Sequence, residues 1–355
     1  MEILLEELYK LDLHIDKYHD RKLFLDDKYN YQIVGITQSG KTKLIKNYLL
    51  EHKKSSYIFI DCNDTRIKSE EINKILEEFC IANSIEIVAF DNYKQEFNIP
   101  NVKQVILSSE LAFELKNFKT LQLNLLDYEE FLAYEHRYDS SAVTHFFHLG
   151  GFAHMHKLSS DVRALYIQKI LQTSLTPIEF AIVELVAKMN AQKLSAYAIY
   201  ERLKGVQKIS KDKLYKSFEG LLTKGYIHQL SKLNHPKAVK KLYLCDIALK
   251  NALSIDKHFG RLFENMIFLE LFKSNVEVFY EEGVEFYLPH NNSIVLCMPF
   301  SDERTLFKKL EQLEAFIFSY QITTITAVTM SKEATISHPL SKVTMVPFDI
   351  WALGD

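Results

Sequence analysis

Residues 35–42 have the types and spacing of a loop that binds phosphate. They read Gly-Ile-Thr-Gln-Ser-Gly-Lys-Thr, which fits the Walker A pattern G-x-x-x-x-G-K-[ST] at every fixed position. The glycines let backbone N–H groups turn toward phosphate oxygens, and a helix that begins near the lysine adds the positive end of its dipole. In this pattern the lysine reaches the β- and γ-phosphates and the threonine hydroxyl binds Mg²⁺. We therefore predict ATP and Mg²⁺ as cofactors, with nucleotide contacts from Gly35, Gln38, Ser39, Gly40, Lys41 and Thr42, and with Thr42 as a metal ligand.

The elements that must position this loop are present on both sides of it. Residues 31–34 are an apolar run that favours a strand, and residues 43–50 carry apolar side chains at helical spacing. The order of strand, glycine loop and helix is therefore complete. Further along, helical spacing recurs at 69–80, and strand patterns occur at 56–61, 85–91 and 102–109. These patterns predict an α/β fold built on a parallel sheet.

Two aspartates end predicted strands, where a second ligand for the metal is expected. Asp91 ends the strand at 85–91, and we assign it as the Walker B carboxylate that reaches the Mg²⁺ hydration shell. Asp61 is the alternative. The residue after Asp91 is Asn92, which can position a water molecule but cannot accept its proton. The sequence therefore supports nucleotide binding better than hydrolysis, unless Asp61, Glu86 or a residue of another subunit acts as the base.

A basic stretch follows in the second half of the chain. Residues 204–241 contain ten lysines and two acidic residues, within a chain whose formal net charge is −3. Capping residues and apolar spacing predict helices that begin after Thr176, Ser195 and Ser210, followed by strands at 226–230 and 239–245. Three helices and a β-hairpin form the winged helix-turn-helix order, whose third helix enters the DNA major groove. Candidate phosphate contacts to duplex DNA are Lys211, Lys213, Lys216, Lys240 and Lys241. The alternative is a solvated or packing face.

The order of these features resembles a family of prokaryotic AAA-type ATPases with a winged-helix domain and a C-terminal restriction-endonuclease-like domain. The resemblance rests on the loop at 35–42, the strand ends at 91 and 108–109, and the patterns Leu-x-Leu-x-x-x-Glu-Glu-Phe-Leu at 123–132, Gly-Gly-Phe at 150–152 and Gly-Arg-Leu-Phe-Glu-Asn at 260–265. It implies an AAA-like P-loop domain at 1–160, a winged-helix domain at 161–250 and the nuclease-like domain at 251–355. It also implies that Ser108 or Ser109 senses the γ-phosphate. The chain departs from the family at Asn92, where the family has glutamate.

Two further expectations concern the regions after the ATP-binding elements. A helix is expected at 110–117, and an arginine finger would have to be Arg137 or Arg163.

The last hundred residues predict helices at 258–273 and 302–318 among strands at 276–280, 284–288, 293–298, 323–330 and 343–348, the order of the nuclease-like core. Glu285 could stand for the acid that such nucleases carry on their second strand, but the third strand has no Glu-x-Lys. We therefore predict an inactive domain, with Glu264 in a structural ion pair or cap.

Composition excludes several classes of protein. With 47% hydrophobic and 25% charged residues the chain belongs to the globular class. No apolar run has the length of a membrane span, and the N-terminus does not resemble a signal peptide, so we expect a cytoplasmic protein without a membrane partner.

The four cysteines form no C-x-x-C pair and are expected to be reduced. The histidines at 145, 148, 154 and 156 suggest a metal site, but they lack an H-E-x-x-H pattern, and we favour surface or core positions.

The sequence leaves three hypotheses open. In the first, the chain is an ATP-binding AAA-like protein in which the nucleotide acts mainly as a conformational ligand, with weak or absent hydrolysis. In the second, it is a working ATPase coupled to DNA or to a protein partner, which includes a homo-oligomer. In the third, it is a DNA-binding regulator whose P-loop is vestigial.

Overall fold

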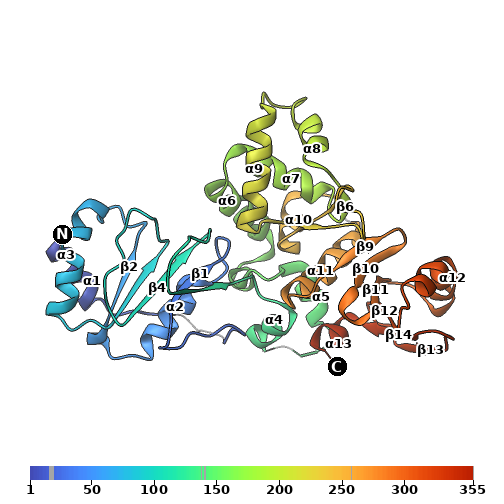
Figure 1. Cartoon of the computed structure of the whole chain (residues 1–355), viewed down its shortest axis with the longest axis horizontal. Coiled ribbons are helices and arrows are strands. Elements are labelled where there is room, and N and C mark those ends of the chain that lie inside the picture. Colours follow the sequence, from blue (N-terminus) through green and yellow to red (C-terminus); the bar gives the residue numbers. More distant parts are fainter. Residues whose placement is uncertain (16–19, 137, 140, 257, 355) are drawn as a thin grey trace. The chain divides into compact units, whose positions relative to one another are not determined.

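The computed structural model of the 355-residue chain describes residues 1–15, 20–136, 138, 139, 141–256 and 258–354. The chain divides into two compact units, Met1–Leu125 and Leu126–Asp355. Figure 1 shows the elements of both units, each of which is described by itself. Among the described residues, no helix combines the length and the apolar character that crossing a membrane requires.

The first unit is built on a five-stranded sheet in which all neighbouring strands are parallel. The strands are β1 (Asn30–Val34), β2 (Tyr57–Asp61), β3 (Ile87–Asp91), β4 (Gln104–Ser109) and β5 (Phe118–Gln122), in the spatial order β2-β3-β4-β1-β5. Strand β4 therefore lies between β1 and β3. The predicted mixed α/β fold with a parallel sheet is confirmed, and it is consistent with a P-loop NTPase-like core.

Helices cover both faces of this sheet. They are α1 (Glu2–Lys10), α2 (Lys41–Leu50) and α3 (Ser69–Ala82), with a short 3-10 helix at Lys54–Ser56. Because successive side chains of a strand point to opposite faces, Val88 and Phe90 join a core with α1 and α3, whereas Ile87 and Ala89 join a core with α2. The first four strands, β1 to β4, each begin within two residues of the predicted start.

The helix predicted at 110–117 is wrong. These residues form an irregular connection between β4 and β5. Phe113 N–H donates to Gln32 Oε1 at 2.6 Å, and Gln32 Nε2 donates to the Phe113 carbonyl at 3.1 Å. The buried Gln32 side chain thus satisfies both backbone groups of Phe113, which a helix would have paired within itself.

The second unit begins with helices and continues into two sheets. Its helices are α4 (Tyr128–Glu135), α5 (Ala142–Leu149), α6 (Ser160–Ser174), α7 (Pro177–Lys188), α8 (Ala196–Leu203), α9 (Lys211–Lys224), α10 (Ile247–Leu253), α11 (Phe259–Lys273), α12 (Glu303–Ser319) and α13 (Phe348–Leu353), with 3-10 helices at Ala153–Lys157 and Pro289–Asn291. Its strands are β6 (Gln192–Lys193), β7 (Ile227–Leu230), β8 (Lys241–Leu244), β9 (Phe279–Glu281), β10 (Val284–Leu288), β11 (Ser293–Cys297), β12 (Thr324–Thr329), β13 (Ala334–Ile336) and β14 (Lys342–Pro347).

The smaller sheet of this unit follows helices α7, α8 and α9. It is antiparallel, with the order β6-β8-β7. Thr176 caps α7 through a capping box with Glu179, as its sequence indicated, and Ser195 and Ser210 cap α8 and α9. The larger sheet has the order β13-β14-β12-β11-β10-β9. In this sheet β12 is parallel to both of its neighbours, β11 and β14. Helix α12 packs its apolar face on this sheet.

Candidate functional site

The loop at 35–42 connects β1 to α2 at the carboxyl end of the sheet. Gly35 lies against the chain that follows β5, because a Cβ atom at this position would come within 2.3 Å of the Leu123 carbonyl oxygen. Gly40 begins α2 with a φ of 99°, in the left-handed region. The loop therefore needs glycine at both positions that define the motif.

Lys41 stands at the first position of α2 and is buried, with 8% of its surface exposed. Its Nζ donates hydrogen bonds to the carbonyl oxygens of Gly35 at 2.7 Å and Ile36 at 2.9 Å. Burial lowers the pKa of Lys41, and the carboxylates of Glu110 and then Asp91 oppose this effect. The ammonium group thus lies inside the loop, where the pattern places β- and γ-phosphates.

The side chains of Thr42 and Asp91 contact each other at the carboxyl end of the sheet. Thr42 Oγ1 donates to Asp91 Oδ2 at 2.6 Å, and Ser108 Oγ donates to Asp91 Oδ1. Asp91 is 2% exposed and ends β3, while Ser108 lies in the neighbouring strand β4. The structure therefore brings together the predicted metal ligands and one predicted sensor. Ser109 differs, because its hydroxyl donates to the Leu111 carbonyl at 2.7 Å.

Asn92 and Asp61 form a separate pair beside this group. Asn92 Nδ2 donates to Asp61 Oδ1 at 3.0 Å, and Asn92 has a φ of 53°, which asparagine tolerates better than most residues. Asp61 ends β2, which is separated from β1 by two strands. Thr42 contacts Asp91 and not the rival Asp61, which favours Asp91 as the metal ligand.

Two residues at the loop were not identified in the sequence. Arg21 Nη1 donates to the Ser39 carbonyl at 2.9 Å, and its Nη2 donates to the Asn124 carbonyl at 2.7 Å. Glu110 Oε1 accepts a hydrogen bond from Thr37 Oγ1 at 2.5 Å. Arg21 lies before the motif in an irregular segment and Glu110 lies beyond β4, so no local pattern links either of them to the loop.

The residues present fit ATP and Mg²⁺. Ser39 is buried, and its Oγ has no hydrogen-bond partner among the described residues, which leaves a donor inside the loop. Thr42 and Asp91 supply the hydroxyl and carboxylate oxygens that Mg²⁺ prefers. Gln38 is exposed on the loop with a φ of 67°. A bound Mg²⁺ would neutralise charge on the phosphates, and Lys41 would add a second positive charge.

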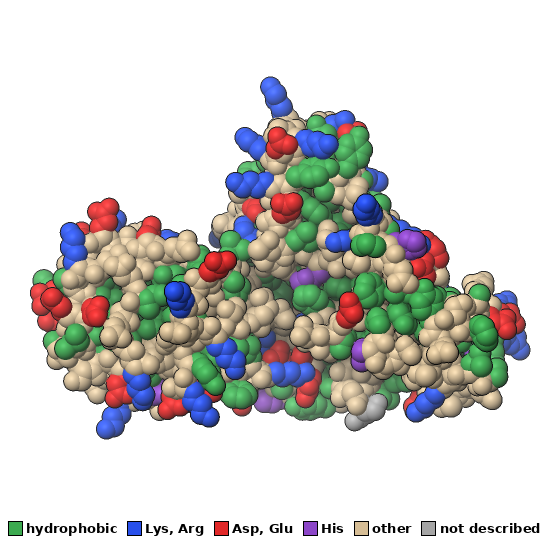
Figure 2. Space-filling view, in the orientation of Figure 1, with side chains coloured by type: hydrophobic (Ala, Val, Ile, Leu, Met, Phe, Trp, Pro, Cys, Tyr) green, Lys and Arg blue, Asp and Glu red, His purple; other side chains and the backbone are tan. Residues whose placement is uncertain are grey.

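The basic side chains of the second unit divide into two groups. Lys211, Lys213 and Lys216 are exposed on α9. Lys213 and Lys216 lie on the side away from the buried Leu214, whereas Lys211 is the first residue of the helix and lies three residues before Leu214, on the same side. Figure 2 shows basic side chains over α8 and α9, with acidic ones among them. Lys240 is half-buried and donates to Gln229 Oε1 at 3.2 Å.

Lys241 belongs to a buried ion pair. Its Nζ lies 2.8 Å from Glu264 Oε1, and the two side chains are 15% and 13% exposed. The Tyr243 hydroxyl also donates to Glu264, at 2.7 Å. Burial raises the pKa of Glu264, and the charge of Lys241 opposes this effect. Lys241 is therefore a structural partner of Glu264, as expected for Glu264 in an ion pair, and we no longer count it among the candidate DNA contacts.

Replacing Lys241 with alanine is expected to destabilise the second unit by about 3–5 kcal/mol at pH 7, because the charge of Glu264 would stay buried without its partner. The loss should shrink as the pH is lowered, since protonation makes Glu264 neutral. Urea unfolding at several pH values measures both effects. Lys240→Ala is the matched control and should cost no more than about 1 kcal/mol. Equal losses in the two variants would contradict this account.

The predicted nuclease-like acid Glu285 is also ion-paired. Its Oε1 lies 3.3 Å from Lys309 Nζ of α12, and its Oε2 faces the Cys297 backbone N–H at 3.4 Å. The third strand, β11, consists of Ser293–Cys297 and carries no carboxylate or lysine. Within the described strand β11, no carboxylate or lysine therefore stands beside Glu285.

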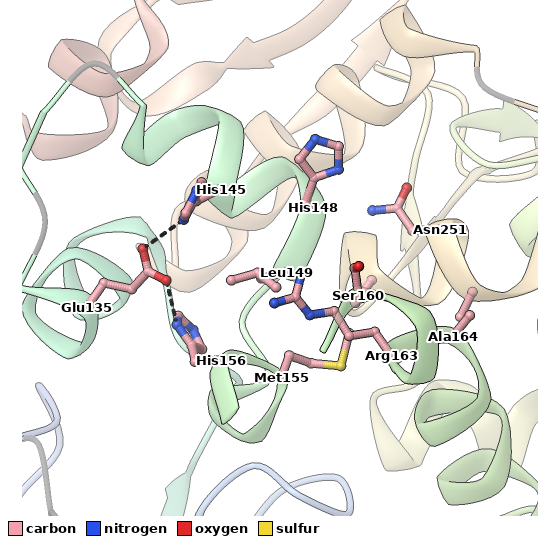
Figure 3. A pocket seen from close by; sticks show the side chains of 12 residues that line it. Glu135, His145, His148, Leu149, Met155, His156, Ser160, Arg163, Ala164 and Asn251 are labelled. Atoms are coloured by element: carbon pink, nitrogen blue, oxygen red, sulfur yellow. Dashed lines mark hydrogen bonds and ion pairs between the residues drawn. The ribbon is translucent and has the colours of Figure 1, made fainter. Parts of the chain in front are cut away.

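Three of the clustered histidines, His145, His148 and His156, line a cavity of about 540 Å³ in the second unit, shown in Figure 3. His154 does not line this cavity, and its ring packs near that of Tyr166. His156 Nδ1 lies 2.8 Å from Glu135 Oε1, and His145 Nδ1 lies 3.3 Å from Glu135 Oε2. Burial lowers the pKa of His156, and Glu135 opposes this effect. The described residues contain no group of three or more His, Cys, Asp or Glu side chains arranged to hold a metal ion.

The two candidate arginine fingers have different outcomes. Arg163 lines the same cavity, and its Nε donates to the Leu158 carbonyl at 3.0 Å. Arg163 is therefore a side chain of the histidine-lined cavity. Arg137 lies outside the described residues.

Comparison with known proteins adds little to these observations. No protein-family model matches the chain. A protein of Methanocaldococcus jannaschii, the uncharacterized protein MJ1544, is 25% identical over 331 residues, which cover 79% of this chain and 74% of that protein. Among solved structures, the Aeropyrum pernix ORC1 protein in complex with DNA covers 66% of this chain and 88% of its own, with 12% identity and a TM-score of 0.31. This similarity is too low to support an argument about function.

Proposed function

We propose that the chain is an AAA-like P-loop protein that binds Mg²⁺-ATP at residues 35–42. The observation that carries the proposal is the contact of 2.6 Å between Thr42 Oγ1 and Asp91 Oδ2. It joins the end of the phosphate loop to the end of β3, across β4, as a shared Mg²⁺ site requires. The Ser39 hydroxyl, which has no hydrogen-bond partner among the described residues, and the buried Lys41 ammonium would supply the remaining contacts to phosphate oxygens.

The proposal separates binding from hydrolysis. Asn92 is an amide, so it cannot take a proton from water, and its Nδ2 is engaged with Asp61. Hydrolysis that depended on residue 92 would be weak or absent. Unless another carboxylate acts as the base, ATP would then act chiefly as a ligand that stabilises one conformation of the protein.

The test of the proposal is calorimetric titration of the full chain with ATP in excess Mg²⁺. One binding site per chain, weakened when EDTA removes the metal, is the expected result. No detectable binding at millimolar ATP by a protein that circular dichroism shows to be folded would contradict it.

A second candidate function is association with duplex DNA through α7, α8, α9, β7 and β8, which we propose to be a winged helix-turn-helix. The observation in its favour is the exposure of Lys211, Lys213 and Lys216 in the first two turns of α9. In such a module this helix would lie in the major groove and its lysines would contact phosphates. Lysine is a point charge, so we expect little reading of base sequence.

Reversing the charge of these three lysines to glutamate is expected to abolish DNA binding. Each phosphate contact adds about 0.9 to the slope of log K against log salt, so the wild-type slope should include about 3 from this helix. Fluorescence anisotropy with a labelled 20-base-pair duplex at 50 to 200 mM salt measures both quantities.

The matched control reverses three exposed lysines on other elements, Lys28, Lys116 and Lys308. Its net charge equals that of the α9 variant. We expect it to keep most of the wild-type affinity and salt slope. If both variants lose binding equally, the interaction depends on overall charge and the assignment to α9 is wrong.

For the larger sheet of the second unit we propose a restriction-endonuclease-like domain without nuclease activity. Glu285 is neutralised by Lys309, and the neighbouring strand β11 offers no second carboxylate for a metal ion. A role in packing or in binding a protein partner then remains for this domain.

A further inference from the structure

ATP hydrolysis at the phosphate loop would need a carboxylate near the γ-phosphate, because residue 92 is an amide. Three acids are candidates within the first unit: Glu86, Asp61 and Glu110. Each must be judged by its position relative to the carboxyl ends of β1 and β4, where the loop lies. A general base acts within hydrogen-bond reach of the water it activates.

Glu86 is at the wrong end of the sheet. It precedes β3, so the strand Ile87–Asp91 separates it from the site by about 17 Å, at 3.3 Å a residue. Its side chain is 56% exposed and pairs with Lys103 at 3.2 Å. Glu86 is therefore a surface residue that does not reach the loop.

Asp61 is at the correct end of the sheet but lies to one side. Strands β3 and β4 separate β2 from β1, which places Asp61 about 14 Å from the end of β1 at the usual strand spacing. Its Oδ1 accepts hydrogen bonds from Asn92 Nδ2 at 3.0 Å and from the Asn63 backbone N–H at 3.0 Å. These two donors hold its carboxylate at the end of β2.

Glu110 lies at the loop itself. It follows β4, which is hydrogen-bonded to β1, and the preceding carbonyl of Ser109 accepts from Gly35 N–H at 3.2 Å. Its carboxylate accepts from Thr37 Oγ1 at 2.5 Å. Burial lowers the pKa of Lys41, and among its charged neighbours Glu110 opposes this effect most, ahead of Asp91. Glu110 therefore lies beside the loop residues that the motif assigns to phosphate binding.

Glu110 also differs from Asp91 in its burial and in the element that holds it. Both oxygens of Asp91 accept hydrogen bonds, from Thr42 and from Ser108, which fixes this buried carboxylate on the metal side of the site. Glu110 is half-buried in an irregular segment and is bound to a loop hydroxyl. A hydroxyl donor orients the carboxylate and still allows it to take up a proton.

We propose that Glu110 is the general base for ATP hydrolysis in this protein, in the place that residue 92 does not fill. This inference rests on the proposed function, since it requires ATP at the loop. Glu110 takes a proton from water while the water oxygen forms a bond to the γ-phosphorus. The bond from that phosphorus to the β-phosphate oxygen breaks, ADP and phosphate leave, and the protonated Glu110 returns its proton to solvent.

The test is Glu110→Gln in the full-length protein, measured by phosphate release at saturating Mg²⁺-ATP and by calorimetric ATP binding. We expect turnover to fall by about 10²- to 10⁴-fold, the usual contribution of a general base. The Kd for ATP should stay unchanged or decrease, since glutamine removes a negative charge beside the phosphates.

Two controls make the outcomes separable. Glu114→Gln changes an exposed glutamate of the same segment and should keep wild-type turnover. Asp61→Asn tests the rival carboxylate and should also keep it. Loss of turnover in Asp61→Asn but not in Glu110→Gln would overturn the inference, as would any rise of turnover in Glu110→Gln.

Failure of the inference and failure of the proposed function give different results. If the wild type binds ATP but releases no phosphate above a Lys41→Ala blank, Glu110 is not a working base, and the binding proposal stands. If the folded wild type binds no ATP, the proposed function fails and the inference fails with it. Binding together with the loss of turnover in Glu110→Gln supports both.

Discussion

Lys41→Ala is expected to abolish the thermal stabilisation that Mg²⁺-ATP gives to the wild-type protein. A ligand present at 100 times its Kd stabilises the folded state by about 2.7 kcal/mol, which raises the unfolding temperature measurably. Removing the ammonium group takes away the positive charge next to the phosphates in a buried loop. We expect at least a 100-fold loss of ATP affinity, measured by differential scanning fluorimetry and by calorimetry.

The stability of Lys41→Ala, measured in the absence of nucleotide, distinguishes a loss of ATP binding from misfolding. Lys41 is buried, and burial lowers its pKa, so the ammonium is costly in the nucleotide-free protein. Its loss should therefore change the nucleotide-free unfolding free energy by no more than about 1 kcal/mol, although two hydrogen bonds to carbonyl oxygens are lost. Lys46→Ala, in the same helix, is the matched control and should keep the full shift. An unchanged shift in Lys41→Ala would mean that ATP binds elsewhere.

Gly150→Ala is expected to destabilise the second unit by about 4 kcal/mol or more. Gly150 ends α5 with a φ of 64° and a ψ of −162°, a region that is almost restricted to glycine. A Cβ atom there would lie 1.9 Å from Asp246 Oδ1. The substitution therefore adds backbone strain of about 1–3 kcal/mol and also displaces a buried carboxylate.

The displaced carboxylate is itself structural. Asp246 is 3% exposed and accepts hydrogen bonds from the backbone N–H groups of Gly151 and Ala248, both at 2.7 Å. Burial raises the pKa of Asp246 to about 6, and these two donors oppose the shift. Losing either bond costs about 1.5–3 kcal/mol, because the acceptor is charged. Urea unfolding followed by circular dichroism measures the total.

A double variant identifies the clash as the cause. Asp246→Ala removes the side chain that the added methyl group would meet, so the two substitutions together should cost at least about 2 kcal/mol less than their sum. Gly205→Ala is the control for a glycine in open surroundings, where a Cβ atom would lie 3.8 Å from the Arg202 carbonyl. It should change stability by less than about 1 kcal/mol. Additive losses would show that the contact with Asp246 is not responsible.

Much of the first unit was predictable, because local patterns set it. The spacing at 35–42 and the strands on either side of it depend on neighbours in the chain, and the structure places them as expected. The helix predicted at 110–117 failed because a distant residue, Gln32, pairs with the backbone at Phe113. A pattern within eight residues holds no information about such a partner.

The assignment of side chains to roles was less predictable. Lys241 looks like any other lysine of a basic stretch, yet it is buried against Glu264, whereas Lys211 is exposed. The double glycine at 150–151 stands out in the sequence only through a family resemblance, and its physical reason is an aspartate almost a hundred residues later. Burial and contact with residues far along the chain decide these cases.

The sequence by itself determined the phosphate loop, its strand and helix, and the absence of a carboxylate at residue 92, because these depend on residue type and short spacing. Only the tertiary structure decided that Asp91 rather than Asp61 meets Thr42, and that Glu110 contacts Thr37. Both outcomes follow from the strand order, which places β4 beside β1 and β2 at the far edge. Strand order is set by the packing of the whole sheet between its helices, so no segment read alone contains it.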